Sequence, residues 1–133
     1  QEIRNKIINQ LTKIGIIKET LANGKKKFMG IVQLEMHGYT KSRHIDIMDT
    51  KPEHYPFAVL YFTGSGSFNA YMRGIALKKG YSLNEYCLSD KITKLEITKE
   101  IIYNKIHKNF FETEEDIFQF LDMEYKDPTQ RNI

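Results

Sequence analysis

An Asn23-Gly24 pair between two apolar segments is the feature that most limits the folds open to this sequence. Both residue types tolerate a positive φ, which the commonest two-residue hairpin turn requires. The sequence therefore predicts a β-hairpin at this point, with strands over residues 14–21 and 27–34. The sheet that contains this hairpin is expected to be small and mixed or antiparallel.

Further elements on both sides of the hairpin are expected to complete a first domain, residues 1–62. Apolar residues recur at helical spacing before the hairpin, so residues 2–13 are predicted to form an amphipathic helix. Residues 35–42 are polar and contain a glycine, which is typical of a loop. Residues 43–48 are predicted to form another strand.

Helix start signals organise the rest of the chain. Thr50 and Glu53 have the spacing of a capping box, which predicts a helix from there to residue 62. The segment Thr63-Gly64-Ser65-Gly66 breaks that helix and is expected to precede a second domain, residues 65–133. The fold class expected is α+β. Short strands over residues 81–97 are expected to interrupt three helices, over residues 66–79, 99–108 and 114–121, with Ser65, Thr98 and Thr113 as candidate caps.

Charge is distributed unevenly along the 133 residues. Residues 1–108 contain 18 Lys and Arg against 10 Asp and Glu, whereas residues 109–133 contain 2 against 7. A basic body with an acidic tail is compatible with a polyanionic partner, because Lys and Arg release counterions when they bind phosphates. An ordinary solvated surface would show the same pattern. Charge alone therefore leaves nucleic-acid binding open.

The single cysteine, Cys87, excludes an internal disulfide and favours a reducing, intracellular compartment. The longest apolar run, residues 57–62, is far too short to span a bilayer, and no secretion signal is visible. We therefore expect no membrane partner. Because the chain begins with Gln1 and not with Met, we expect it to be a piece of a longer protein.

Asp46 is the first candidate for chemistry. It shares the more polar side of its predicted strand with His44, while Ile45 and Ile47 face the other side. A carboxylate there could bind a hard cation such as Mg²⁺, or it could be a solvated strand aspartate. Asp49 is three residues away and would face the opposite side. The pair therefore does not make a metal site, and one carboxylate is not enough for two-metal phosphoryl transfer.

The helix expected after the break has one unusual face. Gly66, Asn69, Ala70 and Arg73 lie together on it, at spacings of three and four residues. The two small residues would let a flat ligand approach closely, and the amide and guanidinium can hydrogen-bond base edges. The alternative is an ordinary face of a helix exposed to solvent.

Other groups carry less specific signals. The lysines of residues 25–27 could bind phosphates or form a solvated turn. Tyr61 and Phe62 could be core aromatics at the end of a helix, or a platform for a sugar or a base. The histidines and the cysteine do not have metal-ligand spacing. The sequence contains neither a catalytic triad nor a glycine-rich phosphate loop.

Four strings in the sequence, taken together, are far more specific than any single residue. In order they read ANGKKKFMGIVQL, SRHIDI, LYFTGSGSFNAYMRGIALKKGYSLNEY and EEDIFQFLDMEYKDPTQR. They resemble the C-terminal third of the family X DNA polymerases, the family that includes DNA polymerase beta. The resemblance covers residues 9–131. It implies that residues 1–62 are the end of a palm domain and residues 65–133 a nucleotide-facing lobe, called thumb or fingers.

The resemblance implies roles for individual residues. Asp46 would be the third catalytic aspartate of the palm, a ligand of Mg²⁺ beside the primer 3′ hydroxyl. Tyr61 and Phe62 would check the sugar of the incoming nucleotide, and Asn69 would contact its base. Gly64-Ser65 would hold an unusual cis peptide bond. The five residues named after Asp46, including Gly64 and Ser65, are the expected nucleotide-binding residues.

Contacts with DNA are also implied. Arg73 would reach the minor-groove side of the templating base, and Tyr86 would act with Glu85 when this lobe closes. The full set of expected DNA contacts is Lys27, Arg43, His44, Arg73 and Tyr86. The Tyr-Phe pair at 61 and 62 favours templated synthesis, since template-independent members of the family tend to have Gly-Trp there.

The sequence departs from the pattern of the family at four positions. Gly66 replaces an acidic residue near the incoming base, and Ala70 replaces a lysine that meets the template. Met48 replaces an arginine linked to closure, which puts the partner role of Glu85 in doubt. His44 replaces an arginine near the primer backbone. The departures bear on nucleotide affinity and closure rather than on family membership.

The function implied is template-directed addition of deoxynucleoside triphosphates to a primer 3′ end, by a monomer that fills gaps in DNA repair with two Mg²⁺ ions. The partners would be primer-template or gapped DNA, and the location the nucleus or, for a virus, the host cytoplasm or the virion. The family's other two aspartates, its Gly-Ser triphosphate motif, its helix-hairpin-helix elements and its lyase domain precede this region. Two alternatives remain, a catalytically inactive nucleic-acid-binding module and a terminal-transferase-like nucleotidyltransferase.

Overall fold

The computed structural model describes residues 2–133, with residue 36 described by its backbone alone. The chain forms two compact units, one that ends at Thr50 and one that begins at Lys51. This division falls earlier in the chain than the expected domain boundary at residues 62–65. The assignment of residues 1–62 and 65–133 to a palm and a nucleotide-facing lobe stays a prediction.

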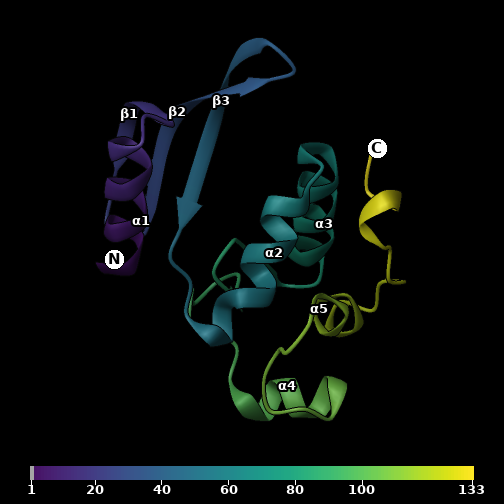
Figure 1. The fold of residues 1–133 in the computed structure, drawn as a ribbon. Coiled ribbons are helices and arrows are strands. Elements are labelled where there is room, and N and C mark those ends of the chain that lie inside the picture. Colours follow the sequence, from purple (N-terminus) through teal and green to yellow (C-terminus); the bar gives the residue numbers. More distant parts are fainter. Residues whose placement is uncertain (1) are drawn as a thin grey trace. The chain divides into compact units, whose positions relative to one another are not determined.

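The first unit is a helix packed on an antiparallel sheet (Figure 1). The strand order is β1-β2-β3. Its core comprises Ile8 of the helix and Ile17, Phe28 and Val32 of the sheet, all of them buried. The elements are α1 (Glu2–Lys13), β1 (Ile17–Asn23), β2 (Lys27–Met36) and β3 (Tyr39–Met48).

The predicted hairpin is present, but its turn was predicted two residues too early. The Gly24 N–H donates to the Lys27 carbonyl at 2.9 Å, so Lys25 and Lys26 form the tip of the turn. The guanidinium of Arg4 binds the Gly24 carbonyl. A turn at residues 23–24 would place Lys26 in the strand, on the face of the buried Phe28, whereas the observed turn leaves Lys25 and Lys26 exposed to water.

The prediction of a loop over residues 35–42 was wrong. Strands β2 and β3 continue through most of it and pair as far as Met36 and Tyr39, so the turn lies at residues 37–38. Gly38 has φ 81°, which only glycine adopts readily. The side chains of this extension are mostly exposed on both faces, and a two-sided polar strand has the composition of a loop.

The second unit is mainly helical (Figure 1). It also contains a short antiparallel hairpin. Its core is formed largely by apolar side chains of α2, α3 and α5, among them Phe57, Phe68, Met72 and Phe118. The elements are η1 (Pro52–His54), α2 (Tyr55–Thr63), α3 (Gly66–Lys78), β4 (Tyr81–Leu83), β5 (Leu88–Asp90), α4 (Lys99–Ile106), α5 (Glu114–Phe120) and η2 (Pro128–Gln130).

The helix caps in this unit were predicted with one exception. Ser65, Thr98 and Thr113 each accept a hydrogen bond from a backbone N–H three residues further on. Thr50 was wrong as a cap, because a 3₁₀ turn precedes α2, whose N-cap His54 makes no side-chain capping bond. Proline in the first turn removes one of the N–H groups that a cap would otherwise satisfy.

The mixture of helices with an antiparallel three-stranded sheet and a two-stranded sheet confirms the expected α+β class. Within residues 2–133, the structure contains no helix long and apolar enough to cross a membrane.

Candidate nucleotide and nucleic-acid site

The junction between α2 and α3 positions the candidate nucleotide residues of the second unit. The peptide bond between Gly64 and Ser65 is cis, as the sequence resemblance led us to expect. Gly64 has φ 68° and ψ −151°, a conformation that only glycine tolerates, so this residue ends α2. Ser65 then caps α3, its Oγ accepting from the Phe68 N–H at 3.2 Å.

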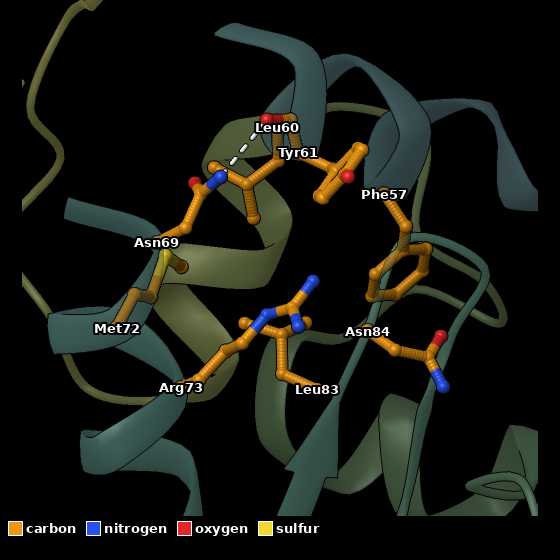
Figure 2. Close-up of a pocket in the computed structure, with 8 residues that line it drawn as sticks. All are labelled: Phe57, Leu60, Tyr61, Asn69, Met72, Arg73, Leu83 and Asn84. Carbon is orange, nitrogen blue, oxygen red and sulfur yellow. Dashed lines mark hydrogen bonds between the residues drawn. The ribbon is translucent and has the colours of Figure 1, made fainter. Parts of the chain in front are cut away.

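Asn69 connects α3 to the end of α2. Its Nδ2 donates a 2.9 Å hydrogen bond to the carbonyl oxygen of Tyr61, shown as the dashed line in Figure 2. This carbonyl is in the last turn of α2, where no backbone N–H of the helix follows to bind it. The bond therefore stabilises the helix end and fixes the amide of Asn69, whose Oδ1 can accept a further hydrogen bond.

Arg73 lies one turn further along the same face of α3. Its Nη2 is 3.5 Å from Glu85 Oε2, and its guanidinium carbon is 5.6 Å from the centroid of the Tyr61 ring. The side chain of Arg73 is 38% exposed, so the ion pair is a weak, partly solvated one of the kind worth about 0–1 kcal/mol. The guanidinium can therefore exchange Glu85 for another acceptor at little cost.

Glu85 therefore has a partner in this chain. The sequence left that role in doubt because Met48 replaces an arginine linked to closure. In the structure the Glu85 carboxylate is paired with Arg73 of α3, at 3.5 Å. Whether Glu85 takes part in closing the lobe stays a prediction.

A small pocket lies beside these side chains (Figure 2). Its volume is about 10 Å³, room for one water molecule and far too little for a base or a sugar. A nucleotide would therefore have to lie on the open surface above the pocket. The residues that line it are Phe57, Leu60, Tyr61, Asn69, Met72, Arg73, Leu83 and Asn84.

Tyr61 and Phe62 are not core aromatics. Their rings are 5.0 Å apart in an edge-to-face arrangement, and Phe62 is 47% exposed. An exposed ring of this size at the end of a helix can stack on an apolar or π surface. The alternative of two core aromatics is thus not observed, whereas the role of the pair as a platform for a sugar or a base stays a prediction.

Asn84 is a residue of the pocket that the sequence analysis did not single out. Its Oδ1 accepts from the N–H groups of Tyr86 at 2.8 Å and Cys87 at 2.9 Å, which forms the turn between β4 and β5. This turn sets the backbone of Glu85 and Tyr86. The signal was available, because Asn between two short strands is typical of a side-chain-bonded turn.

The candidate residues of the first unit divide between the two faces of its sheet. Lys27 is paired with Met48, and Asp46 with Met29, so these side chains share one face with His44, which is paired with Ile31. This face is opposite to the one covered by α1, which receives Ile45 and Ile47 as predicted.

Arg43, by the alternation of the strand, does not share the face of Asp46. Its Nη1 donates to the neighbouring Ser42 carbonyl at 3.0 Å, and its side chain is exposed. The structure therefore brings together Lys27, His44 and Asp46, but not Arg43.

The described residues do not form a magnesium site by themselves. Within residues 2–133, no group of three or more His, Cys, Asp or Glu side chains is arranged to hold a metal ion. Asp46 is exposed on the sheet and could supply one carboxylate oxygen. The Oδ2 atom of Asp49 lies 3.4 Å from Nη1 of Arg4 in an ion pair. This agrees with the prediction that Asp49 points away from the face of Asp46.

Comparison with known proteins gives matches to DNA polymerases, both for a family model and for individual relatives. A family model described as DNA polymerase beta thumb matches residues 58–132, which include the whole of the α2–α3 junction. The chain is 30% identical over 137 residues to DNA polymerase lambda of Rattus norvegicus, a match that covers 99% of this chain and 23% of the relative.

Two further relatives match a smaller share of the chain. DNA-directed DNA/RNA polymerase mu of Homo sapiens is 35% identical over 95 residues, and DNA nucleotidylexotransferase of Xenopus laevis is 31% identical over 94 residues. Each match covers 69% of this chain and 16% of the relative. The chain thus spans less than a quarter of the length of the curated relatives it matches. The matched thumb model and these relatives confirm the resemblance: the chain belongs to the family X DNA polymerases.

Proposed function

We propose that this chain provides the nucleotide-facing lobe and the end of the palm of a template-directed DNA polymerase, one that adds deoxynucleotides to a primer 3′ end. The observation that carries the proposal is the surface formed by Tyr61, Asn69 and Arg73. A bond to a backbone carbonyl orients the amide, and the guanidinium lies one turn away beside an aromatic ring. Amide and guanidinium groups are the side chains that read base edges.

Each group on this surface has a defined task in the proposal. The exposed ring of Phe62 and the neighbouring Tyr61 contact the sugar of the incoming nucleotide, next to the backbone of Gly64 and Ser65. Asn69 hydrogen-bonds the incoming base. Arg73 leaves Glu85 and reaches the templating base, an exchange that the weakness of their exposed ion pair permits.

Side chains of both units would bind the DNA. Lys27 and His44 are on the sheet face that also carries Asp46, and Arg43 is exposed elsewhere on the same strand. Tyr86 is held by the Asn84 turn beside the pocket residues. Such contacts are sequence-independent and weaken as salt rises.

The magnesium chemistry belongs to a complete polymerase and not to this chain alone. Two Mg²⁺ ions would stabilise the charge of an in-line displacement at the α-phosphate. The part that this chain would play is limited to the carboxylate of Asp46. Its place on an open strand face, opposite the α1-covered core, leaves it accessible to other ligand groups.

Primer extension by the full-length product of this reading frame tests the proposal. We expect Mg²⁺-dependent extension on primer-template and on gapped DNA, and none on a single-stranded primer. Efficient extension of the single-stranded primer would instead support a terminal-transferase-like enzyme, a class represented among the relatives by DNA nucleotidylexotransferase. DNA binding without extension on any substrate would support the inactive binding module.

The biological setting is part of the proposal. A preference for short gaps over open primer-template would support a role in gap-filling repair. We further propose that the protein acts as a monomer on DNA, in the nucleus or, for a viral protein, in the host cytoplasm or the virion. Size-exclusion chromatography with light scattering and imaging of the tagged protein test these two points.

A further inference from the structure

Arg131 is a buried charged residue outside the proposed nucleotide surface. Its side chain is 0% exposed, although it follows η2 close to the end of the chain. Burying a guanidinium is costly unless it is paired and hydrogen-bonded. The contacts that it makes therefore indicate what its burial maintains.

The guanidinium is held from several sides. Its Nη1 is 2.5 Å from Glu114 Oε2 at the start of α5, and its Nε donates to the Lys126 carbonyl at 2.8 Å. Its carbon atom is 5.1 Å from the ring centroid of Phe118 and 5.7 Å from that of Phe68. Arginine stacked on aromatic rings and bound by a carboxylate has one fixed orientation.

The backbone of Arg131 makes a second connection, to the cap of α3. Its carbonyl oxygen accepts from the Ser65 N–H at 3.2 Å and from the Ser65 hydroxyl at 2.8 Å. The same hydroxyl accepts from the Phe68 N–H. Arg131 thus contacts the first turn of α3 at Ser65 through its backbone and at Phe68 through its side chain.

These two contacts restrain α3 at the point where the nucleotide surface begins. A helix held at one residue can still turn about its axis, whereas contacts at Ser65 and Phe68 limit that rotation. Asn69 follows Phe68 directly, and its bond to the Tyr61 carbonyl requires one orientation of the helix. The orientation of Asn69 is thereby linked to a residue near the C-terminus.

We propose that Arg131 is a positioning residue for the nucleotide surface. Its carbonyl and guanidinium fix the first turn of α3, and this sets the orientation of Asn69. The proposal deepens, and in its effect on catalysis rests on, the proposed polymerase function. Its structural part can be tested on the 133-residue chain without any activity.

The variant that tests it is Arg131→Lys, which keeps the charge but loses the planar fork that stacks and bonds at once. In ¹H–¹⁵N spectra of the folded chain we expect shifts at the Ser65 and Phe68 amides and at the side-chain amide of Asn69. Hydrogen exchange of that side-chain amide should quicken by roughly tenfold, the effect of losing about one hydrogen bond. Milder shifts at the same positions are expected for Glu114→Gln, which also serves if Arg131→Lys does not fold.

Asp116→Asn is the matched control. Asp116 is a buried carboxylate of the same helix as Glu114, but it bonds residues 108, 112 and 113 and not α3. The Asp116→Asn substitution should lower the melting temperature and leave the resonances and the hydrogen exchange of the Asn69 side-chain amide unchanged. If Arg131→Lys and Glu114→Gln lower the melting temperature in the same way without moving the Asn69 resonances, Arg131 is only a stabilising residue and the proposal is overturned.

Nucleotide kinetics of the full-length protein give an independent readout. A positioning effect on Asn69 should raise the nucleotide KM by roughly tenfold, the equivalent of about one hydrogen bond, while kcat changes much less. An equal fall in kcat with unchanged KM would contradict positioning. If the unaltered protein does not extend primers at all, the proposed function fails, whereas the spectra still decide the structural role of Arg131.

Discussion

At the scale of single residues, Asp46 has a simple environment. It is exposed on a strand, directly opposite Met29 across the strand pair, on the sheet face that it shares with Lys27 and His44. In the full-length protein, Asp46→Ala should abolish nucleotide addition and leave DNA affinity within about twofold, because a metal ligand acts on chemistry more than on docking. Primer extension and a gel shift on the same preparation measure the two effects.

The control for Asp46 is Glu35→Ala, which removes another exposed carboxylate of the same sheet. It should leave both measurements unchanged. Near-normal extension by Asp46→Ala would remove Asp46 from the mechanism.

Arg73 is expected to affect the selectivity for the correct nucleotide. Because its proposed role is to sense the geometry of the templating pair, Arg73→Ala should reduce discrimination between correct and incorrect nucleotides. A hydrogen bond from a charged donor is worth about 1.5–3 kcal/mol, so discrimination should fall by roughly ten- to a hundredfold. Single-nucleotide incorporation kinetics with right and wrong nucleotides provide the measurement.

Lys78→Ala is the matched control for Arg73, since it removes an exposed cation from the end of the same helix. Discrimination by this variant should stay at the level of the unaltered protein. Equal losses of rate for right and wrong nucleotides in Arg73→Ala would show that Arg73 only positions other groups.

At the scale of elements, the N-terminus of α5 depends on Asp116. Burial alone would raise the pKa of this carboxyl, but hydrogen bonds from the Glu112 N–H, the Lys108 ammonium and the Thr113 N–H together lower it below 3.8. A folded-state pKa below the unfolded value stabilises the fold above the unfolded pKa. That contribution is lost as the pH falls through the folded-state pKa.

Asp116→Asn should therefore lower the free energy of unfolding at pH 7 by about 1–2 kcal/mol, as for the loss of a helix cap. The difference from the unaltered chain should shrink as the pH is lowered from about 5 to about 2. Urea unfolding at several pH values measures it. Glu115→Gln, an exposed change in the same turn, should show neither effect; a constant difference at all pH values would contradict the assignment.

At the scale of the whole molecule, the 133-residue chain should fold and yet synthesise no DNA. Each unit has its own buried core, which can stabilise the unit without contacts from other domains. Two Mg²⁺ ions beside a triphosphate need several carboxylates, and the described residues offer no such cluster. Primer extension by the chain alone with Mg²⁺ and all four nucleotides should give no product. Templated product from a preparation free of other polymerases would refute the assignment of the site.

The basic charge of the chain should still give weak DNA binding. Lys25 and Lys26 are exposed at the tip of the β1–β2 hairpin, where phosphates can reach them. Each phosphate contact adds about 0.9 to the slope of log affinity against log salt, so Lys25→Gln with Lys26→Gln should reduce that slope by roughly 1–2. Fluorescence anisotropy at several salt concentrations measures it, with Lys6→Gln on α1 as the control. An unchanged slope would exclude the hairpin tip from the DNA surface.

Local sequence signals predicted most of the elements because their causes are local. Apolar spacing predicted α1, and the hydroxyl caps at residues 65, 98 and 113 predicted three helix starts, since each needs only a neighbouring backbone N–H. The same reasoning missed the turn at Lys25-Lys26 and the length of β2 and β3. Register there depends on pairing across strands, which composition does not show.

For the candidate site, the sequence by itself determined the family and which residues are candidates for a nucleotide face, because specific strings at fixed spacing carry both. Only the tertiary structure decided the partners of those residues. Asn69 binds the Tyr61 carbonyl, Glu85 pairs with Arg73, and Arg131 is buried against α3 and α5. These contacts join residues that lie 8, 12 and up to 66 positions apart in the chain. Their formation depends on the packing of whole helices around a shared core, and no local pattern of the sequence encodes it.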